Sequence, residues 1–127
     1  MMPILKKGSL VRGDKKTVVT CIKLLDSNDT IYKMVDVEKI IIKGYGKISR
    51  DLERERETFY LVLEGYAKVS FPGDERTQAI FMSPGDLLYI PPGITHSIMN
   101  TSDEQLVIYV FYCPTRHSNN HINSMSQ

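Results

Sequence analysis

Residues 85–100 read "GDLLYIPPGITHSIMN", and this stretch decides the fold. Pro91 and Pro92 follow a short apolar run and end it, because proline donates no hydrogen bond to a strand ladder. Gly93 then permits a backbone angle that other residues resist. The chain reverses at this turn, and His96 begins the next strand. The stretch therefore predicts two strands joined by a rigid turn, with one histidine at the start of the second strand.

The rest of the chain is punctuated in the same way. Short runs rich in Val, Ile, Tyr and Phe alternate with clusters of Gly, Pro, Asn and Asp, a pattern typical of all-β proteins. Regular short strands of this kind predict a sandwich or a barrel. The predicted strands are residues 17–25, 30–37, 39–46, 58–65, 67–71, 77–82, 86–90, 96–100 and 106–112.

Composition excludes several classes of protein. The chain has 127 residues, of which 42% are hydrophobic and 24% charged, and its formal net charge is +1. These values are ordinary for a soluble domain and indicate neither a nucleic-acid partner nor a membrane partner. No apolar run approaches a membrane span, and the N-terminus lacks the apolar core of a signal peptide. Cys21 and Cys113 form no CxxC motif, so we expect a cytoplasmic protein without a disulfide framework.

The key residues of the opening stretch stand at fixed intervals. They are Gly85, Pro91, Gly93, His96 and Asn100. This spacing resembles the second signature motif of the cupin superfamily, with every marker residue present. The resemblance implies an all-β fold, the cupin-type double-stranded β-helix or jelly-roll barrel. Because side chains alternate along a strand, Asn100 is expected to share the inward face of His96.

The first cupin motif lies upstream and is only partly present: its two end glycines match, and its metal-ligand positions do not. Its two framing glycines are in register at Gly46 and Gly65. The three positions that hold metal ligands in the family carry Leu52, Arg54 and Thr58. Leucine cannot ligate a metal, arginine is a fixed cation that repels one, and one remaining histidine does not make a tight site. We therefore predict no metal-binding residues and no cofactor.

The resemblance covers residues 39–112, which is most of the chain. We expect one domain over residues 1–113, with its core motifs at 46–65 and 85–100. Residues 114–127 have little to bury and are predicted to form a flexible tail.

A homodimer is predicted from the faces of one strand. If Thr58 faces the barrel interior, then Phe59, Leu61 and Leu63 face outward. Soluble monomers seldom leave a contiguous apolar patch bare. N-terminal strands could cover some of this patch, and a twofold dimer would bury the rest in one symmetric contact.

The candidate catalytic residues are His96, Tyr60 and Tyr89. The imidazole of His96 titrates near neutrality, which suits a general acid or base. The alternative is a histidine that only hydrogen-bonds within the core. Tyr60 and Tyr89 could line the cavity as hydrogen-bond donors or proton carriers, or they could pack in the core with satisfied hydroxyls.

The candidate ligand-binding residues are Arg54, Thr58, His96 and Asn100. Arg54 could be a buried cation for an anionic ligand, because a buried arginine is rare unless it is paired. The alternative places Arg54 near the rim, where it reaches water or a neighbouring glutamate.

The charge run "RDLERERE" at residues 50–57 is predicted to be a solvated hairpin tip, with Glu55, Arg56 and Glu57 in its turn. Glu57 stands one residue from the family's glutamate position. A slip of one residue turns a strand side chain to the other face.

Three functions fit these observations. The first is binding of a small polar or anionic molecule, a sugar or a carboxylate, without a tightly held metal, in a metal-independent isomerase, epimerase or cyclase. His96 would then transfer a proton while Arg54 neutralises a developing oxyanion. The second is a non-catalytic module that senses a ligand or dimerises. The third is a divergent metalloenzyme that recruits Glu53, Glu55 or Glu57 beside His96.

Overall fold

Nine β-strands and one short 3-10 helix make up the part of the chain that the computed structural model describes, residues 3–5, 18–50, 56–74 and 76–114. The predicted all-β fold is confirmed. The elements are β1 (Val19–Leu25), η1 (Ser27–Asp29), β2 (Asp36–Ile42), β3 (Lys47–Arg50), β4 (Arg56–Glu64), β5 (Ala67–Ser70), β6 (Ile80–Met82), β7 (Leu87–Ile90), β8 (His96–Asn100) and β9 (Leu106–Pro114).

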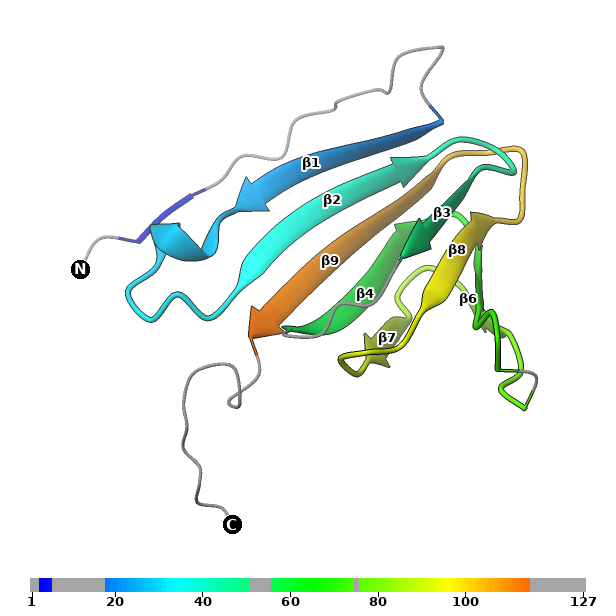
Figure 1. Cartoon of the computed structure of the whole chain (residues 1–127). Coiled ribbons are helices and arrows are strands. Elements are labelled where there is room, and N and C mark those ends of the chain that lie inside the picture. Colours follow the sequence, from blue (N-terminus) through cyan, green and yellow to red (C-terminus); the bar gives the residue numbers. More distant parts are fainter. Residues whose placement is uncertain (1–2, 6–17, 51–55, 75, 115–127) are drawn as a thin grey trace.

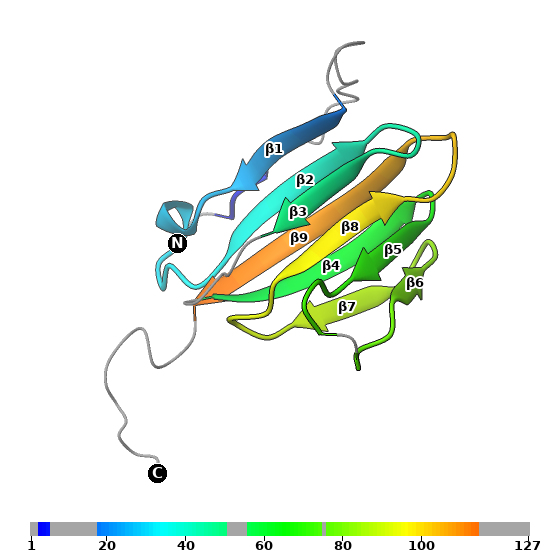
Figure 2. The same cartoon turned by 45° about the vertical axis from the view of Figure 1, so that its right-hand side comes forward.

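The strands form two antiparallel sheets that lie face to face (Figures 1 and 2). One sheet has the order β1-β2-β9-β4-β7, and the other has the order β3-β8-β5-β6. From β2 onward the chain passes back and forth between the sheets, except at β5 and β6, which pair within one sheet. Thus β7 and β8 belong to different layers although only a short turn joins them. This alternation is the double-stranded β-helix that the opening stretch predicted.

The core lies between the two sheets and is filled by every second residue of each strand, as the period of two requires. On β4, for example, Thr58, Tyr60 and Val62 are buried, while Phe59 and Leu61 between them are partly exposed. The inward positions of the other strands supply the remaining core side chains, which include Ile40, Ile42, Ala67, Val69, Met82, Ile90, Ile98, Leu106, Ile108 and Val110.

The strand predicted at residues 30–37 is wrong. Only its last two residues belong to a strand, at the start of β2. Before it, the carboxylate of Asp26 accepts a hydrogen bond from the Asn28 amide at 2.9 Å, and that of Asp29 accepts one from the Asp26 amide at 3.0 Å. Local bonds of this kind offer the backbone an alternative to a strand ladder, and here they form the capped turn η1.

Two further boundaries differ from the prediction. The strand expected at residues 39–46 is the end of β2, and the separate strand β3 at Lys47–Arg50 was missed. Arg56 and Glu57 lie in β4, not in a turn, because β9 continues far enough to pair with them at Pro114 and Cys113. Residues 51–55 and 115–127, which hold the rest of the charge run and the predicted tail, lie outside the described residues.

The N-terminal strands extend one sheet sideways. β1 pairs with β2, and β2 pairs with β9, so neither strand stacks on the outer face of β4. On that face Leu63 is 43% exposed and Leu87 of the neighbouring β7 is 63% exposed. In the described part of the chain, no helix has the length and apolar character needed to cross a membrane.

Candidate functional site

Polar side chains gather at one end of the space between the sheets, where β4 begins and β9 ends. They occupy inward positions, in line with the apolar core residues of the same strands. They are Asp36 and Glu38 on β2, Arg56, Thr58 and Tyr60 on β4, His96 on β8 and Tyr112 on β9. We call this group the polar end of the barrel.

Strand register brings five of these residues from three strands together. Tyr112 pairs with Asp36 on one side and with Thr58 on the other, which makes one row across the sheet. In the next row Val110 lies between Glu38 and Tyr60. Directly opposed residues in a sheet have their Cβ atoms about 5 Å apart, so these side chains form one surface.

His96 and Tyr60 form a buried hydrogen-bonded pair across the two sheets. The Tyr60 hydroxyl lies 2.8 Å from Nε2 of His96, and their rings meet edge to face at a centroid distance of 5.5 Å. Nδ1 of His96 lies 2.9 Å from the carbonyl oxygen of Ile94. A carbonyl can only accept, so Nδ1 carries the proton in the neutral ring and Nε2 accepts from the tyrosine. The turn before β8 thus sets both the tautomer and the orientation of the ring.

Arg56 is held by an acidic and an aromatic partner. Its Nη1 lies 3.3 Å from Oδ2 of Asp36, and its guanidinium carbon lies 4.3 Å from the centre of the Tyr112 ring. The Tyr112 hydroxyl in turn donates to Oε1 of Glu38 at 3.1 Å. The Arg56 side chain remains 34% exposed, so this cation is both oriented by the protein and reachable from solvent.

The structure brings some of the predicted site residues together and separates others. His96, Tyr60 and Thr58 lie at or next to the polar end, and Thr58 is 3% exposed. Asn100 shares their inward direction but lies four residues further along β8, about 13 Å from His96 at the usual rise of a strand. Arg54 lies outside the described residues.

Asn100 is fully used in holding the backbone. Its amide nitrogen donates to the carbonyl oxygens of Ile42 at 3.0 Å and Glu104 at 2.6 Å, and its side-chain oxygen accepts from the Ser102 amide at 3.0 Å. Its own backbone amide donates to Gly46 at 2.8 Å, which ties the two motifs together. This geometry gives Asn100 a structural role in place of the predicted contact with a ligand.

Tyr89 points out of the barrel, away from His96. It pairs with Phe59 on the outer face, where the two rings lie 5.1 Å apart, and it is 44% exposed. Its hydroxyl donates to the carboxylate of Glu57, and this hydrogen bond raises the pKa of Tyr89 above its usual value. Tyr89 therefore does not line the interior, and Glu57 is not placed beside His96.

The donor set at the polar end does not fit the metal that the family's enzymes hold. Of the family's ligand positions, the structure describes Thr58 and His96, and both nitrogens of His96 are already hydrogen-bonded. Among the described residues, no group of three or more His, Cys, Asp and Glu side chains is arranged to hold a metal ion. We therefore derive no chemistry that passes through a metal.

Comparison with known families agrees with this geometry. The family model described as "Cupin domain" matches residues 40–112, which include both motifs and all residues of the polar end except Asp36 and Glu38. The chain belongs to the cupin family. No match is found among curated protein sequences.

Solved cupin structures have the same fold at low sequence identity. An oxalate oxidase in complex with the substrate analogue glycolate superposes with a TM-score of 0.71 at 16% identity, over 85% of this chain. This cupin chain spans only 58% of that one. The cupin domain of Cnp3 from Schizosaccharomyces pombe gives a TM-score of 0.67 at 13% identity, over 87% of this chain and 75% of its own. A cupin superfamily protein from Desulfitobacterium hafniense gives a TM-score of 0.66 at 20% identity, over 87% of this chain and 90% of its own.

Sequence reasoning missed four residues of the polar end: Asp36, Glu38, Arg56 and Tyr112. The period of two carried a signal for Arg56, because it lies two residues before Thr58 and four before Tyr60 on the same face. It also pointed to Tyr112, which alternates with Val110 and Ile108. The sequence pattern does not predict the register of β2 and β4 against β9, and this register places Asp36 beside Arg56.

Proposed function

We propose that this cupin binds a small anionic molecule, a carboxylate or a sugar acid, at the polar end of the barrel and moves a proton on it without a metal. The observation that carries the proposal is the 2.8 Å contact between the Tyr60 hydroxyl and Nε2 of His96. Both side chains are nearly enclosed, at 1% and 4% exposure, where a proton transfer is shielded from water.

The chemistry is a proton transfer next to a carbonyl group of the ligand. The Tyr60 oxygen takes a proton from carbon while its own proton passes to Nε2 of His96. The imidazolium that forms donates from Nδ1 to Ile94, at the contact that already exists. The electron pair of the broken C–H bond moves to the carbonyl oxygen, and Arg56 stabilises that oxyanion. Return of the proton to the other face of the same carbon, as the electron pair moves back from the oxyanion, gives an epimer of the substrate.

Solvent exchange tests this proposal without knowledge of the natural substrate. The protein is incubated in D2O with a panel of keto acids, aldoses and uronic acids, and NMR follows the loss of C–H signals. We expect catalysed exchange for a member of the panel that falls at least about a hundredfold with Tyr60→Phe, the low end of general acid–base contributions. Tyr89→Phe makes the same chemical change on the outer face and should leave the rate unchanged. Equal rates in both variants would exclude the Tyr60–His96 pair as the catalyst.

A second candidate function is a ligand-binding module without catalysis. It is favoured by the self-contained network at the polar end, since Arg56 already has a carboxylate partner and an aromatic partner. One solved neighbour is the Cupin_2 domain of an XRE family transcriptional regulator from Enterobacter cloacae, with a TM-score of 0.67 at 13% identity. Saturable binding of a panel member with no exchange in D2O would favour this function.

We also propose a homodimer formed through the outer face of the five-stranded sheet. Leu61 pairs with Leu87 and Phe59 with Tyr89, which makes a continuous apolar surface over β4 and β7 that β1 and β2 do not cover. Light scattering should give twice the chain mass of 14.5 kDa, and Leu61→Glu should give monomers. A 14.5 kDa particle at every concentration would contradict the dimer. Cys21 and Cys113 form no disulfide, which is in keeping with the expected cytoplasmic location.

A further inference from the structure

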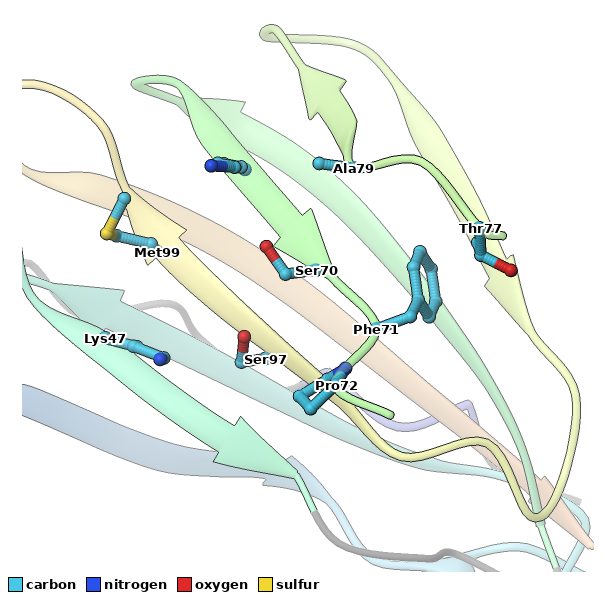
Figure 3. A pocket seen from close by; sticks show the side chains of 9 residues that line it. Lys47, Ser70, Phe71, Pro72, Thr77, Ala79, Ser97 and Met99 are labelled. Carbon is cyan, nitrogen blue, oxygen red and sulfur yellow. The ribbon is translucent and has the colours of Figure 1, made fainter. Parts of the chain in front are cut away.

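The outer face of the four-stranded sheet carries a hollow of about 360 Å³, on the side of β8 opposite His96 (Figure 3). This volume falls in the range of small-molecule sites. The lining residues come from β3, β5, β8 and the loop after β5. They are Lys47, Lys68, Ser70, Phe71, Pro72, Thr77, Ala79, Ser97 and Met99.

Register explains why two lysines and two serines meet here. Met99 on β8 pairs with Lys47 of β3 on one side and with Lys68 of β5 on the other. The two lysines therefore flank β8, about 10 Å apart at the usual strand spacing. In the next row Ser97 pairs with Ser70. Figure 3 shows Lys47, Ser70 and Ser97 projecting from three adjacent strands on the side of the hollow.

The lining of the hollow carries two cations, Lys47 and Lys68, and no acidic side chain. The nearby carboxylate of Asp74 accepts hydrogen bonds from the backbone and hydroxyl of Thr77. Within the described ranges, the ion pairs are Lys23 with Asp26 and Arg56 with Asp36, so neither Lys47 nor Lys68 is neutralised by a carboxylate there. The ammonium of Lys68 lies 6.0 Å from the Phe81 ring centre, a contact that orients the cation without cancelling its charge.

Ser97 provides an independent sign of a ligand. It is only 4% exposed although it lies on the outer face of the sheet. Among the described residues, no side-chain hydrogen bond satisfies its hydroxyl, in contrast to Ser102 and Thr101 nearby. A buried polar group without a partner in the protein is rare and costly, and one that lines a hollow can bond to a ligand or to water there.

We propose that this hollow is a second binding site, for a small organic phosphate monoester such as a sugar phosphate. A phosphate monoester carries about −1.5 to −2 charges at neutral pH, which matches two lysines, and its oxygens accept hydrogen bonds from hydroxyls such as those of Ser70 and Ser97. Phe71 and Pro72 supply an apolar wall for the organic part. The site is separate from the barrel interior, because Ser97 and His96 point to opposite faces of β8.

Titration of the 15N-labelled protein with glucose 6-phosphate, inorganic phosphate and glucose tests the proposal. We expect glucose 6-phosphate to shift the amide signals of Ser70, Ser97 and Met99, with glucose giving no shifts and inorganic phosphate binding more weakly. Added salt should weaken binding, because the lysines are close to solvent. No shifts at these residues, or equal binding of inorganic phosphate and the ester, would overturn a site for an organic phosphate.

Matched variants assign the binding to this hollow. The double variant Lys47→Ala, Lys68→Ala should raise the dissociation constant at least about tenfold, the scale of a lost charged hydrogen bond. Lys23→Ala removes one exposed lysine from the other sheet and should leave binding unchanged. If Lys23→Ala raises the dissociation constant as much as the double variant does, the binding is non-specific attraction to positive charge and the proposed site is wrong.

Ser97→Ala separates a ligand contact from a structural one. We expect it to weaken glucose 6-phosphate several-fold with no loss of thermal stability, because no partner within the protein is left unsatisfied. A drop in melting temperature with unchanged affinity would mean that the hydroxyl serves the fold through water, and it would contradict the proposal.

Discussion

The two ends of the barrel interior use buried polar side chains for different purposes. At one end, the Asn100 amide group bonds mainly to backbone atoms, those of Ile42, Ser102 and Glu104. At the other end, His96 and Tyr60 bond to each other, and Nδ1 of His96 bonds to the backbone. Both residues of β8 face inward and both are buried. An amide bound to backbone locks a loop, whereas an imidazole bound to a phenol holds a proton that can move.

Replacement of Asn100 should be the most damaging change. Asn100→Ala removes four side-chain hydrogen bonds and takes a partner from two carbonyl groups and one amide group at buried and part-buried positions. We expect the free energy of unfolding to fall by about 3 kcal/mol or more, at 1–3 kcal/mol for each unsatisfied group that stays dry. Urea unfolding measures this.

Thr101→Ala is the matched control, because it removes one exposed hydrogen bond to Tyr66 at 3.3 Å on the next residue of the chain. Its cost should stay within about 0.5 kcal/mol, as for most surface changes. Equal costs for the two variants would mean that Asn100 does not secure the loops.

Gly65 and Gly93 lie in turns at opposite ends of the barrel, and their surroundings differ. Gly65, after β4, has a φ of +87°, and a Cβ there would lie 2.7 Å from the Gln105 carbonyl oxygen. Gly93, before β8, has a φ of +84°, with no atom within 4 Å of an added Cβ. Gly93→Ala should cost about 1–2 kcal/mol from the left-handed backbone alone. Gly65→Ala should lower the free energy of unfolding by more, because the backbone at Gln105 and Leu106 must also shift to make room for the Cβ.

The measurement is the same urea titration for both glycine variants. A smaller loss for Gly65→Ala than for Gly93→Ala would contradict the close packing of the β4–β5 turn against Gln105.

The sequence predicted the fold well because its information is local. Pro91, Pro92 and Gly93 specify a turn by their own backbone preferences, and the period of two then assigns His96, Ile98 and Asn100 to the interior. The structure confirms these points. The prediction failed at residues 30–37, because the Thr30 hydroxyl donates to the Ser27 carbonyl and accepts from the Lys33 amide. Such local bonds compete with strand formation, and propensity alone does not register them.

The site was harder to predict, because its contacts depend on register between strands distant in sequence. Arg56 and Asp36 meet across β9, which lies between their strands. Tyr60 and Tyr89 have similar local surroundings in sequence, yet one faces His96 and the other faces Glu57. Tyr60 lies on β4 and Tyr89 on β7, so the pairing of these two strands must be known before each side chain can be assigned to the inner or the outer face.

These two tyrosines also give a test of stability. Tyr60→Phe removes the hydroxyl that His96 accepts from, inside the core, and we expect it to lower the free energy of unfolding by about 1 kcal/mol. Tyr89→Phe removes a hydroxyl that is exposed on the outer face, and its effect should stay within about 0.5 kcal/mol. If Tyr89→Phe is the more destabilising of the two, the bond to Glu57 matters more to the fold than the His96–Tyr60 pair does.

The smallest expected effect concerns how burial and two acidic groups, Glu57 and Asp36, act on the thiol of Cys113. Cys113 lies in β9 opposite Glu57, and burial, followed by the charges of Glu57 and Asp36, raises the pKa of its thiol. Only the thiolate reacts with iodoacetamide, so a raised pKa lowers the reactive fraction at a given pH and moves the pH profile of alkylation upward. We therefore expect Cys113 to reach its half-maximal rate at a higher pH than free cysteine in a short peptide. Glu57→Gln should move the profile part of the way back, because burial, the larger cause, remains. Alkylation of Cys113 that follows the peptide profile would show that these carboxylates do not reach the thiol.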